Sequence, residues 1–147
     1  MVRKEILLQI HLLSYTRIGD VRDYIAGLGI ADNNNVYCGK LDNKKDKSIG
    51  VYNLNRQRPP QTAVGGLNNS SYRIKSVSIL VHWNKSVRDT EETSEQLYNM
   101  LRDTNNKIIN DTKLLFTKMQ VDGPVDVGTD DKGIFESVIE LDIYYER

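Results

Sequence analysis

Alternation of apolar and polar side chains marks the strongest predicted strands of this chain. In the segment 72–83, apolar residues from Val77 to Trp83 share one face, and in 134–145 a similar apolar row alternates with acidic residues. One apolar and one polar face per strand are typical of an antiparallel sheet that is covered on one side. Because the apolar residues before Ser76 fall on the opposite phase, we expect a β-bulge near that residue.

Apolar residues at helical spacing predict three helices, at 3–13, 19–28 and 89–104. Asp20 is suited to cap the second helix, and Asp89 begins a sequence that resembles a capping box for the third. Each predicted helix has one apolar stripe, so each should pack one side against a sheet.

Shorter apolar runs predict further strands at 36–38, 49–54 and 114–121. The region from about residue 40 to 70 is otherwise polar and basic, and a proline pair and a glycine pair interrupt it, so we expect an extended loop or hairpin excursion there. The helices flank the strand segments and do not alternate with them. The sequence therefore predicts a single α+β domain over residues 1–147: a mainly antiparallel twisted sheet, flanked by helices on one face, with a long extended loop.

Composition narrows the possible functions. The 147 residues include 20 basic and 20 acidic side chains, and this zero net charge argues against a dedicated nucleic-acid-binding protein. Cys38 is the single cysteine, so no disulfide can form within the chain, and we expect a small buried thiol. No stretch approaches the ~18 apolar residues that a membrane span requires, and the apolar start lacks the pattern of a signal peptide.

An acidic cluster near the end of the chain is the main candidate for chemistry. Asp126, Asp130 and Asp131 stand beside Gly128 and Gly133, directly before the last predicted strand. They could bind a divalent metal in a small hydrolase, but their spacing does not match a calcium-binding loop. Aspartate and glycine are also the residues that a tight hairpin turn requires, and this interpretation is favoured.

The remaining candidate residues point to structural roles. His11 and His82 belong to no recognisable metal-binding motif, and the chain has no phosphate loop, dinucleotide fingerprint or nucleophile elbow. We therefore expect no catalytic residues, no metal and no cofactor.

Charge is distributed unevenly along the chain. Residues 40–58 contain six basic and two acidic side chains, a surplus of +4, whereas residues 122–147 contain eight acidic and two basic ones, a surplus of −6. Two oppositely charged segments can make a protein complementary to a copy of itself, in a head-to-tail contact that closes into a ring or continues as a filament. They can equally be two ordinary solvated surfaces.

Four sequence features then occur in a fixed order: Ser48-Ile49-Gly50-Val51-Tyr52; Pro59-Pro60, Gly65-Gly66 and Tyr72; the strand Val77–Trp83, which leads through Asp89-Thr90-Glu91-Glu92 into Leu97–Leu101; and the ending Val127–Glu136. Together they resemble the phage minor capsid and tail terminator family, also called tail-completion or head–tail joining proteins. The resemblance covers the whole chain.

This resemblance implies a structural protein that is not an enzyme. Family members form a ring, commonly of six subunits, on top of the tail tube, where they end tube polymerisation and offer a surface to the head connector. The implied partners are copies of the chain, the tail tube protein, and sheath or head connector proteins. DNA would pass through the ring without specific binding, and no membrane is involved.

The implied location is a virion or a phage-tail-like particle such as a tail-like bacteriocin, assembled in the cytoplasm of the bacterial host. A head–tail connector adaptor is the alternative structural function. The small metal-dependent hydrolase that uses Asp126–Asp131 is the alternative from another class.

Charge suggests where copies of the chain would meet. We expect the basic excursion of one subunit to approach the acidic ending of the next, through Lys44, Lys45, Lys47, Arg56 and Arg58 against Asp126, Asp130, Asp131 and Glu136. Exposed ion pairs contribute only ~0–1 kcal/mol each. Apolar contacts must therefore supply most of the affinity, while charge sets the register of the contact.

Overall fold

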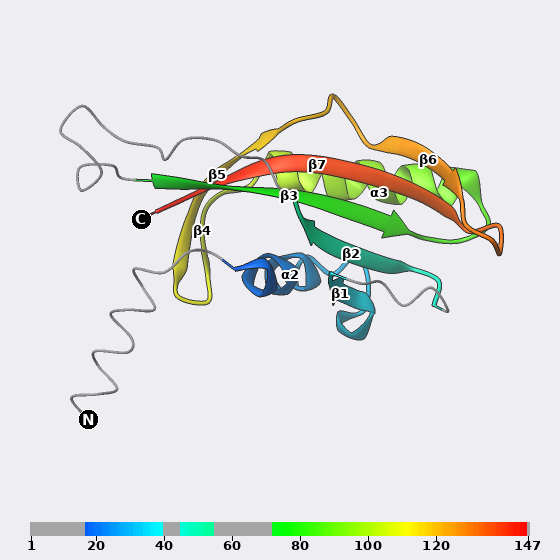
Figure 1. Cartoon of the computed structure of the whole chain (residues 1–147), viewed down its shortest axis with the longest axis horizontal. Coiled ribbons are helices and arrows are strands. Elements are labelled where there is room, and N and C mark those ends of the chain that lie inside the picture. Colours follow the sequence, from blue (N-terminus) through cyan, green and yellow to red (C-terminus); the bar gives the residue numbers. More distant parts are fainter. Residues whose placement is uncertain (1–16, 40–44, 55–71, 147) are drawn as a thin grey trace.

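The computed structural model describes residues 17–39, 45–54 and 72–146, and Figure 1 shows how their elements are arranged. The elements in chain order are α2 (Ile18–Gly27), η1 (Asn33–Asn35, a 3₁₀ helix), β1 (Val36–Cys38), β2 (Ser48–Asn53), β3 (Tyr72–His82), α3 (Val87–Arg102), β4 (Asn105–Ile109), β5 (Thr112–Met119), β6 (Val125–Thr129) and β7 (Phe135–Glu146). Every strand predicted from the sequence is found, with its ends displaced by at most two residues.

The strands form one seven-stranded sheet in the order β1-β2-β3-β7-β5-β4, and β6 pairs with β7 beside β5. β1 and β2 are parallel, whereas every other pair is antiparallel. β3 and β7 form the centre, with an uninterrupted ladder from Tyr72 opposite Glu146 to His82 opposite Glu136. The predicted α+β fold with a mainly antiparallel sheet is confirmed.

Both described helices pack on the same face of the sheet. Ile79 of β3 and Leu141 of β7 lie on this face and are fully buried, together with Leu97 of α3 and Ile25 of α2. A fully buried Leu or Ile side chain contributes about 1.5–3 kcal/mol through removal from water. This burial holds the two helices on the sheet, as the apolar stripes predicted.

The bulge expected near Ser76 is wrong, because β3 pairs with β7 without a register shift. Tyr72 and Ile74 therefore lie on the face that no described helix covers. The rings of Tyr72 and Phe116 both contact Tyr144 there, with centroid distances of 5.6 and 4.4 Å. The change of phase in the sequence thus reflects a second apolar cluster on the opposite face.

The starts of both helices differ from the prediction. Arg17 is the N-cap of α2, and Asp20 occupies the third helical position, where its carboxylate accepts the Arg17 N–H at 3.0 Å. Ser86 is the N-cap of α3, and its hydroxyl accepts the Asp89 N–H at 3.2 Å. Both aspartates are thus in the first turn of a helix, where negative charge is favourable, and not at the cap.

Strands β4 and β6 were not predicted. Four of the five residues of β4 and all five of β6 are exposed, so neither strand shows the alternation that burial of one face imposes. Within the excursion expected at about 40–70, residues 48–53 form β2. The structure also describes residues 45–47 and Leu54 of that excursion, and the rest of it lies outside the described residues. The predicted helix at 3–13 lies outside them as well.

Candidate functional site

The acidic cluster forms a hairpin turn between β6 and β7, as predicted. Asp130 organises this turn, because its Oδ1 accepts the N–H of Lys132 at 2.8 Å and that of Ile134 at 2.9 Å. Gly133 has a φ of +82°, a conformation that glycine adopts more readily than other residues. The hydrogen bond from Ile134, together with that from Lys132 and the neighbouring His82, holds the pKa of Asp130 below its usual value.

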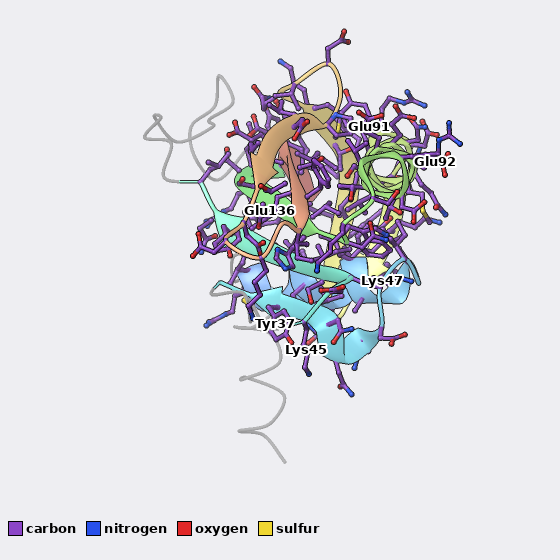
Figure 2. All side chains as sticks on the ribbon, turned by 90° about the vertical axis from the view of Figure 1, so that its right-hand side faces the viewer. Tyr37, Lys45, Lys47, Glu91, Glu92 and Glu136 are labelled. Carbon is purple, nitrogen blue, oxygen red and sulfur yellow. The ribbon has the colours of Figure 1, made fainter. Side chains whose placement is uncertain are left out.

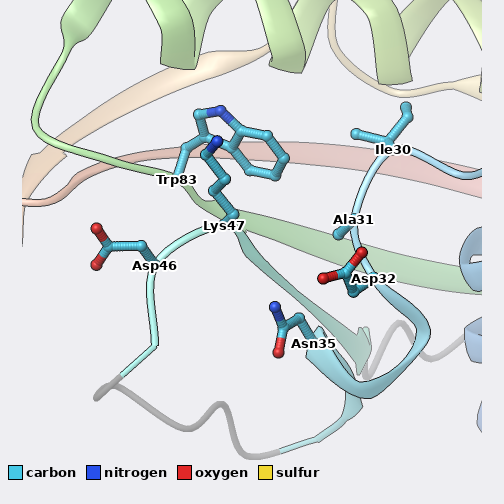
Figure 3. Close-up of a pocket in the computed structure, with 7 residues that line it drawn as sticks. All are labelled: Ile30, Ala31, Asp32, Asn35, Asp46, Lys47 and Trp83. Atoms are coloured by element: carbon cyan, nitrogen blue, oxygen red, sulfur yellow. The ribbon is translucent and has the colours of Figure 1, made fainter.

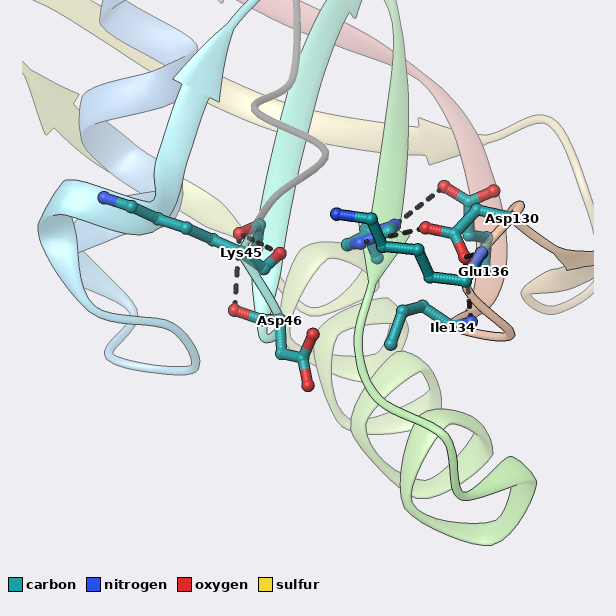
Figure 4. Close-up of polar contacts among 8 residues, drawn as sticks. Lys45, Asp46, Asp130, Ile134 and Glu136 are labelled. Atoms are coloured by element: carbon teal, nitrogen blue, oxygen red, sulfur yellow. Dashed lines mark hydrogen bonds and ion pairs between the residues drawn. The ribbon is translucent and has the colours of Figure 1, made fainter.

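His82, the last residue of β3, lies between the carboxylates of Asp130 and Glu136 at this end of the sheet. Figure 4 labels the two acidic residues. Its side chain is 0% exposed, and Nδ1 is 3.0 Å from Oε2 of Glu136. An ionised carboxylate can only accept, so Nδ1–H is the donor. Nε2 lies 3.6 Å from Oδ2 of Asp130, which is too far for a hydrogen bond and within ion-pair distance only for a protonated ring. The imidazole therefore joins β3 to β7 and to the turn, a structural role that fits the expectation.

One row of register partners crosses the sheet at this end: Ser48, His82, Glu136 and Gly128, on β2, β3, β7 and β6. Lys47 immediately precedes Ser48. Neighbouring strands are about 4.8 Å apart, so β2 and β6 are separated by roughly 14 Å here. The basic residues before β2 and the acidic turn after β6 thus occupy the same end of the molecule.

We call this end, with Lys45 and Lys47 before β2 and the turn 130–133 after β6, the charged end. Figure 2 looks onto it. Glu91 and Glu92 project from α3 in the upper part of the view, and Lys45 and Lys47 lie below Glu136. The side chains of Glu91, Glu92, Lys45 and Lys47 are exposed. The charged end therefore carries acidic groups on its α3 side and basic groups on its β2 side.

The predicted interface residues fall into three groups. Four are exposed at the charged end: Lys45, Lys47, Asp126 and Asp131. Two make contacts within their own chain, to His82 and to the backbone of the turn: Asp130 and Glu136. Three lie outside the described residues: Lys44, Arg56 and Arg58.

Two of the three carboxylates of the cluster, those of Asp126 and Asp130, have partners within the chain. Oδ1 of Asp126 accepts the N–H of Gly128 at 2.8 Å, and the His82 ring separates Asp130 from Glu136. Across residues 17–39, 45–54 and 72–146, no three His, Cys, Asp or Glu side chains are arranged to hold a metal ion. This arrangement supplies turn geometry and strand attachment.

Cys38 is exposed at the end of β1, which corrects the expectation of a buried thiol. Burial falls along this short strand, from buried Val36 through Tyr37 to Cys38. β1 is an edge strand of the sheet, and its last residue is exposed.

The partners of His82 were not foreseen from the sequence. His82 and Glu136 each occupy the polar phase of their strand, which was the available signal. They are 54 positions apart, however, and only the register of the β3–β7 ladder places them opposite each other.

Residues 24–147 match a family model described as bacteriophage tail terminator protein. The chain belongs to this tail terminator family. A search of curated proteins and a search of solved structures each returned no match.

As a tail terminator family member, the chain is a structural protein of phage tail assembly and a component of a virion or phage tail particle. The family predicted from the four sequence features is confirmed. The matched range includes the hairpin turn, His82 and the exposed Lys45 and Lys47. Among the described helices, none has the length and apolar character needed to cross a membrane.

Proposed function

We propose that this tail terminator protein forms a ring at the end of a tail tube and stops the tube from growing. The family match over residues 24–147 is the observation that carries this proposal. The zero net charge suits a ring through which DNA passes, because a surplus of positive charge would bind phosphate. The expected partners are copies of the chain, commonly six in all, and the tube protein.

The exposed groups of the charged end are candidates for contacts between copies. Lys45 and Lys47 precede β2, which lies roughly 14 Å across the sheet from β6. Asp126 lies on β6, and Asp131 lies in the turn that follows β6. In a ring, the basic patch of one copy would face the acidic patch of the next copy, which is a head-to-tail contact. Among the described residues, we propose that Lys45 and Lys47 of one copy pair with Asp126 and Asp131 of the next, because Asp130 and Glu136 already contact His82 in their own chain. Lys44, Arg56 and Arg58 remain part of the proposed basic surface.

Tube capping is tested by electron microscopy of tail tubes that grow with and without the full chain. The expected result is a ring at one tube end and an arrest of tube growth. Tubes of unchanged length without a density at the end would reject the proposed function. A chain that binds the head connector and leaves tube growth unchanged would favour the adaptor function.

Charge pairing is tested by reversing Lys45 and Lys47 to glutamate. We expect association of copies to weaken, most strongly at low salt, because the new repulsion is screened at high salt. The matched control reverses Arg102 and Lys118, which are exposed away from the charged end. Association of the Lys45/Lys47 variant that equals the control's at low salt would show that this pairing is wrong.

A further inference from the structure

A recess with an aromatic wall lies beside the charged end (Figure 3). It has a volume of about 400 Å³, within the roughly 300–1,000 Å³ range of pockets that hold small ligands. Trp83 and Ile30 give it apolar surface, and Asp32 and Asp46 stand on either side of it. Lys47 extends toward the Trp83 ring in the same view.

Four polar side chains line this recess. Within the described part of the chain, Asp32, Asn35, Asp46 and Lys47 make no side-chain hydrogen bond or ion pair. Two carboxylates against one ammonium leave the recess with a formal charge of −1. Trp83 is a core residue that is 8% exposed, and its remaining exposed surface lines the recess. The recess therefore suits an apolar group that is accompanied by a positive charge.

A projection with this chemistry stands on the hairpin of β4 and β5. Ile108 is 77% exposed, the highest value among the exposed large hydrophobic side chains of the described residues. Lys107 precedes it and Lys113 lies opposite it in the ladder, and both lysines are exposed. Asn110 in the turn donates to Asp20 of α2 at 2.6 Å, which holds the hairpin against the body of the protein.

The recess and the hairpin lie at opposite ends of the sheet. The N–H of Trp83 donates to the carbonyl of Phe135, the first residue of β7, whereas β5 pairs with β7 from Leu141 to Tyr145. Figure 1 shows the β4–β5 hairpin at one end of the long axis and the ends of β3 and β6 at the other. A contact between two different surfaces at opposite ends repeats from copy to copy, and it closes into a ring when the rotation permits.

We propose that the β4–β5 hairpin of one copy docks into the Trp83 recess of the next copy. Ile108 contacts Trp83 and Ile30 of the neighbour, and Lys107 approaches Asp32. This contact rests on the proposed ring function and supplies its head-to-tail interface. The charge pairing shares Lys47 with this contact, because Lys47 lines the recess, and it differs from this contact in Lys45, Asp126 and Asp131.

The single tryptophan of the chain makes the contact directly measurable. The experiment follows Trp83 emission and sedimentation of the full chain as concentration rises, alone and with tail tubes. We expect the emission to change together with assembly. Ile108→Ser should weaken association by about tenfold or more, as truncation of an interface anchor does. The matched control is Val125→Ser, a similar truncation of an exposed residue on β6, which should associate as the unchanged chain does.

Charge exchange tests the partner of Lys107. Lys107→Glu should weaken association, and the double variant Lys107→Glu with Asp32→Lys should restore it, because the pair forms again with reversed signs. Unchanged thermal unfolding of each variant verifies that folding is intact.

Normal association of Ile108→Ser, constant Trp83 emission during assembly, or absence of charge rescue would each overturn the docking contact. If the unchanged chain still caps tubes in that case, the proposed function stands and only this interface is wrong. If the unchanged chain neither assembles nor caps tubes, both proposals fail. Loss of tube binding in Ile108→Ser with normal association of copies would assign the hairpin to the tube and reject a second copy as its partner.

Discussion

Replacing His82 by phenylalanine tests whether the contacts of this buried ring hold the charged end together. The substitution keeps a planar ring at a fully buried position and removes the Nδ1–H that Glu136 accepts at 3.0 Å. It also removes Nε2, which lies 3.6 Å from Asp130. β7 and the turn then lose their polar attachment to β3, while the strand pairing of the backbone remains.

The expected cost follows from the geometry. A hydrogen bond to an ionised group contributes about 1.5–3 kcal/mol net. The Glu136 side chain is 19% exposed, so water can partly replace the lost donor and the lower half of that range applies. Burial of an apolar ring offsets a further fraction, up to about 1 kcal/mol. We therefore expect His82→Phe to lower the free energy of unfolding by about 1–2 kcal/mol.

Urea unfolding at neutral pH measures this difference, and thermal unfolding gives a second value. A change of 1 kcal/mol shifts the melting temperature by about 2–4 °C in a domain near this size. Glu136→Gln and the double variant complete a mutant cycle, which isolates the energy of the His82–Glu136 pair from other effects of each change. We expect a coupling energy of about 1 kcal/mol.

Additive effects of His82→Phe and Glu136→Gln on the free energy of unfolding would refute this reasoning. A coupling below about 0.5 kcal/mol means that the two residues do not stabilise each other. Equal or greater stability of His82→Phe would show that ring packing alone holds the strands at this end.

Two further predictions concern the turn that Asp130 organises. The pKa of Asp130 is below its ordinary value of 3.8, so its ionised form stabilises the folded state at neutral pH, and this contribution is lost as the pH falls through 3.8 and below. Thermal unfolding should therefore show that the stability of Asp130→Asn declines less steeply than that of the unchanged chain between pH 5 and about pH 2. Asp131→Asn is the control, because it removes a carboxylate without contacts in the described residues. This control should retain the steeper decline. Gly133→Ala should cost about 1–2 kcal/mol in urea unfolding, because its φ of +82° is strained for a residue with a Cβ atom. Gly123→Ala is the control, since no atom within 4 Å meets the added Cβ, and a loss equal to that of Gly133→Ala would contradict the conformational explanation.

Local chemistry made part of this protein predictable from its sequence. Alternation over 72–83 and 134–145 identified β3 and β7, because burial of one face imposes a two-residue period on each strand. Asp130 and Gly133 indicated a turn, because a carboxylate that accepts neighbouring N–H groups and a glycine at positive φ act within a few residues. The order of short sequence features was enough to predict the family.

Exposed elements were harder to predict. β4 and β6 have no buried face, so selection for burial leaves no periodic signal in them. Their place in the sheet depends on backbone pairing with β5 and β7, in which nearly any side chain can take part.

The tertiary structure alone decided which distant residues meet. The register of β3 against β7 places His82 opposite Glu136, and it brings the basic residues before β2 to the same end as the acidic turn. It also sets the Trp83 recess and the Ile108 hairpin at opposite ends of β7. Strand order and register are set by the packing of the whole sheet against its helices, and therefore by contacts between residues far apart in the chain. The sequence by itself determined the strands and the turn, because their causes lie within a few neighbouring residues.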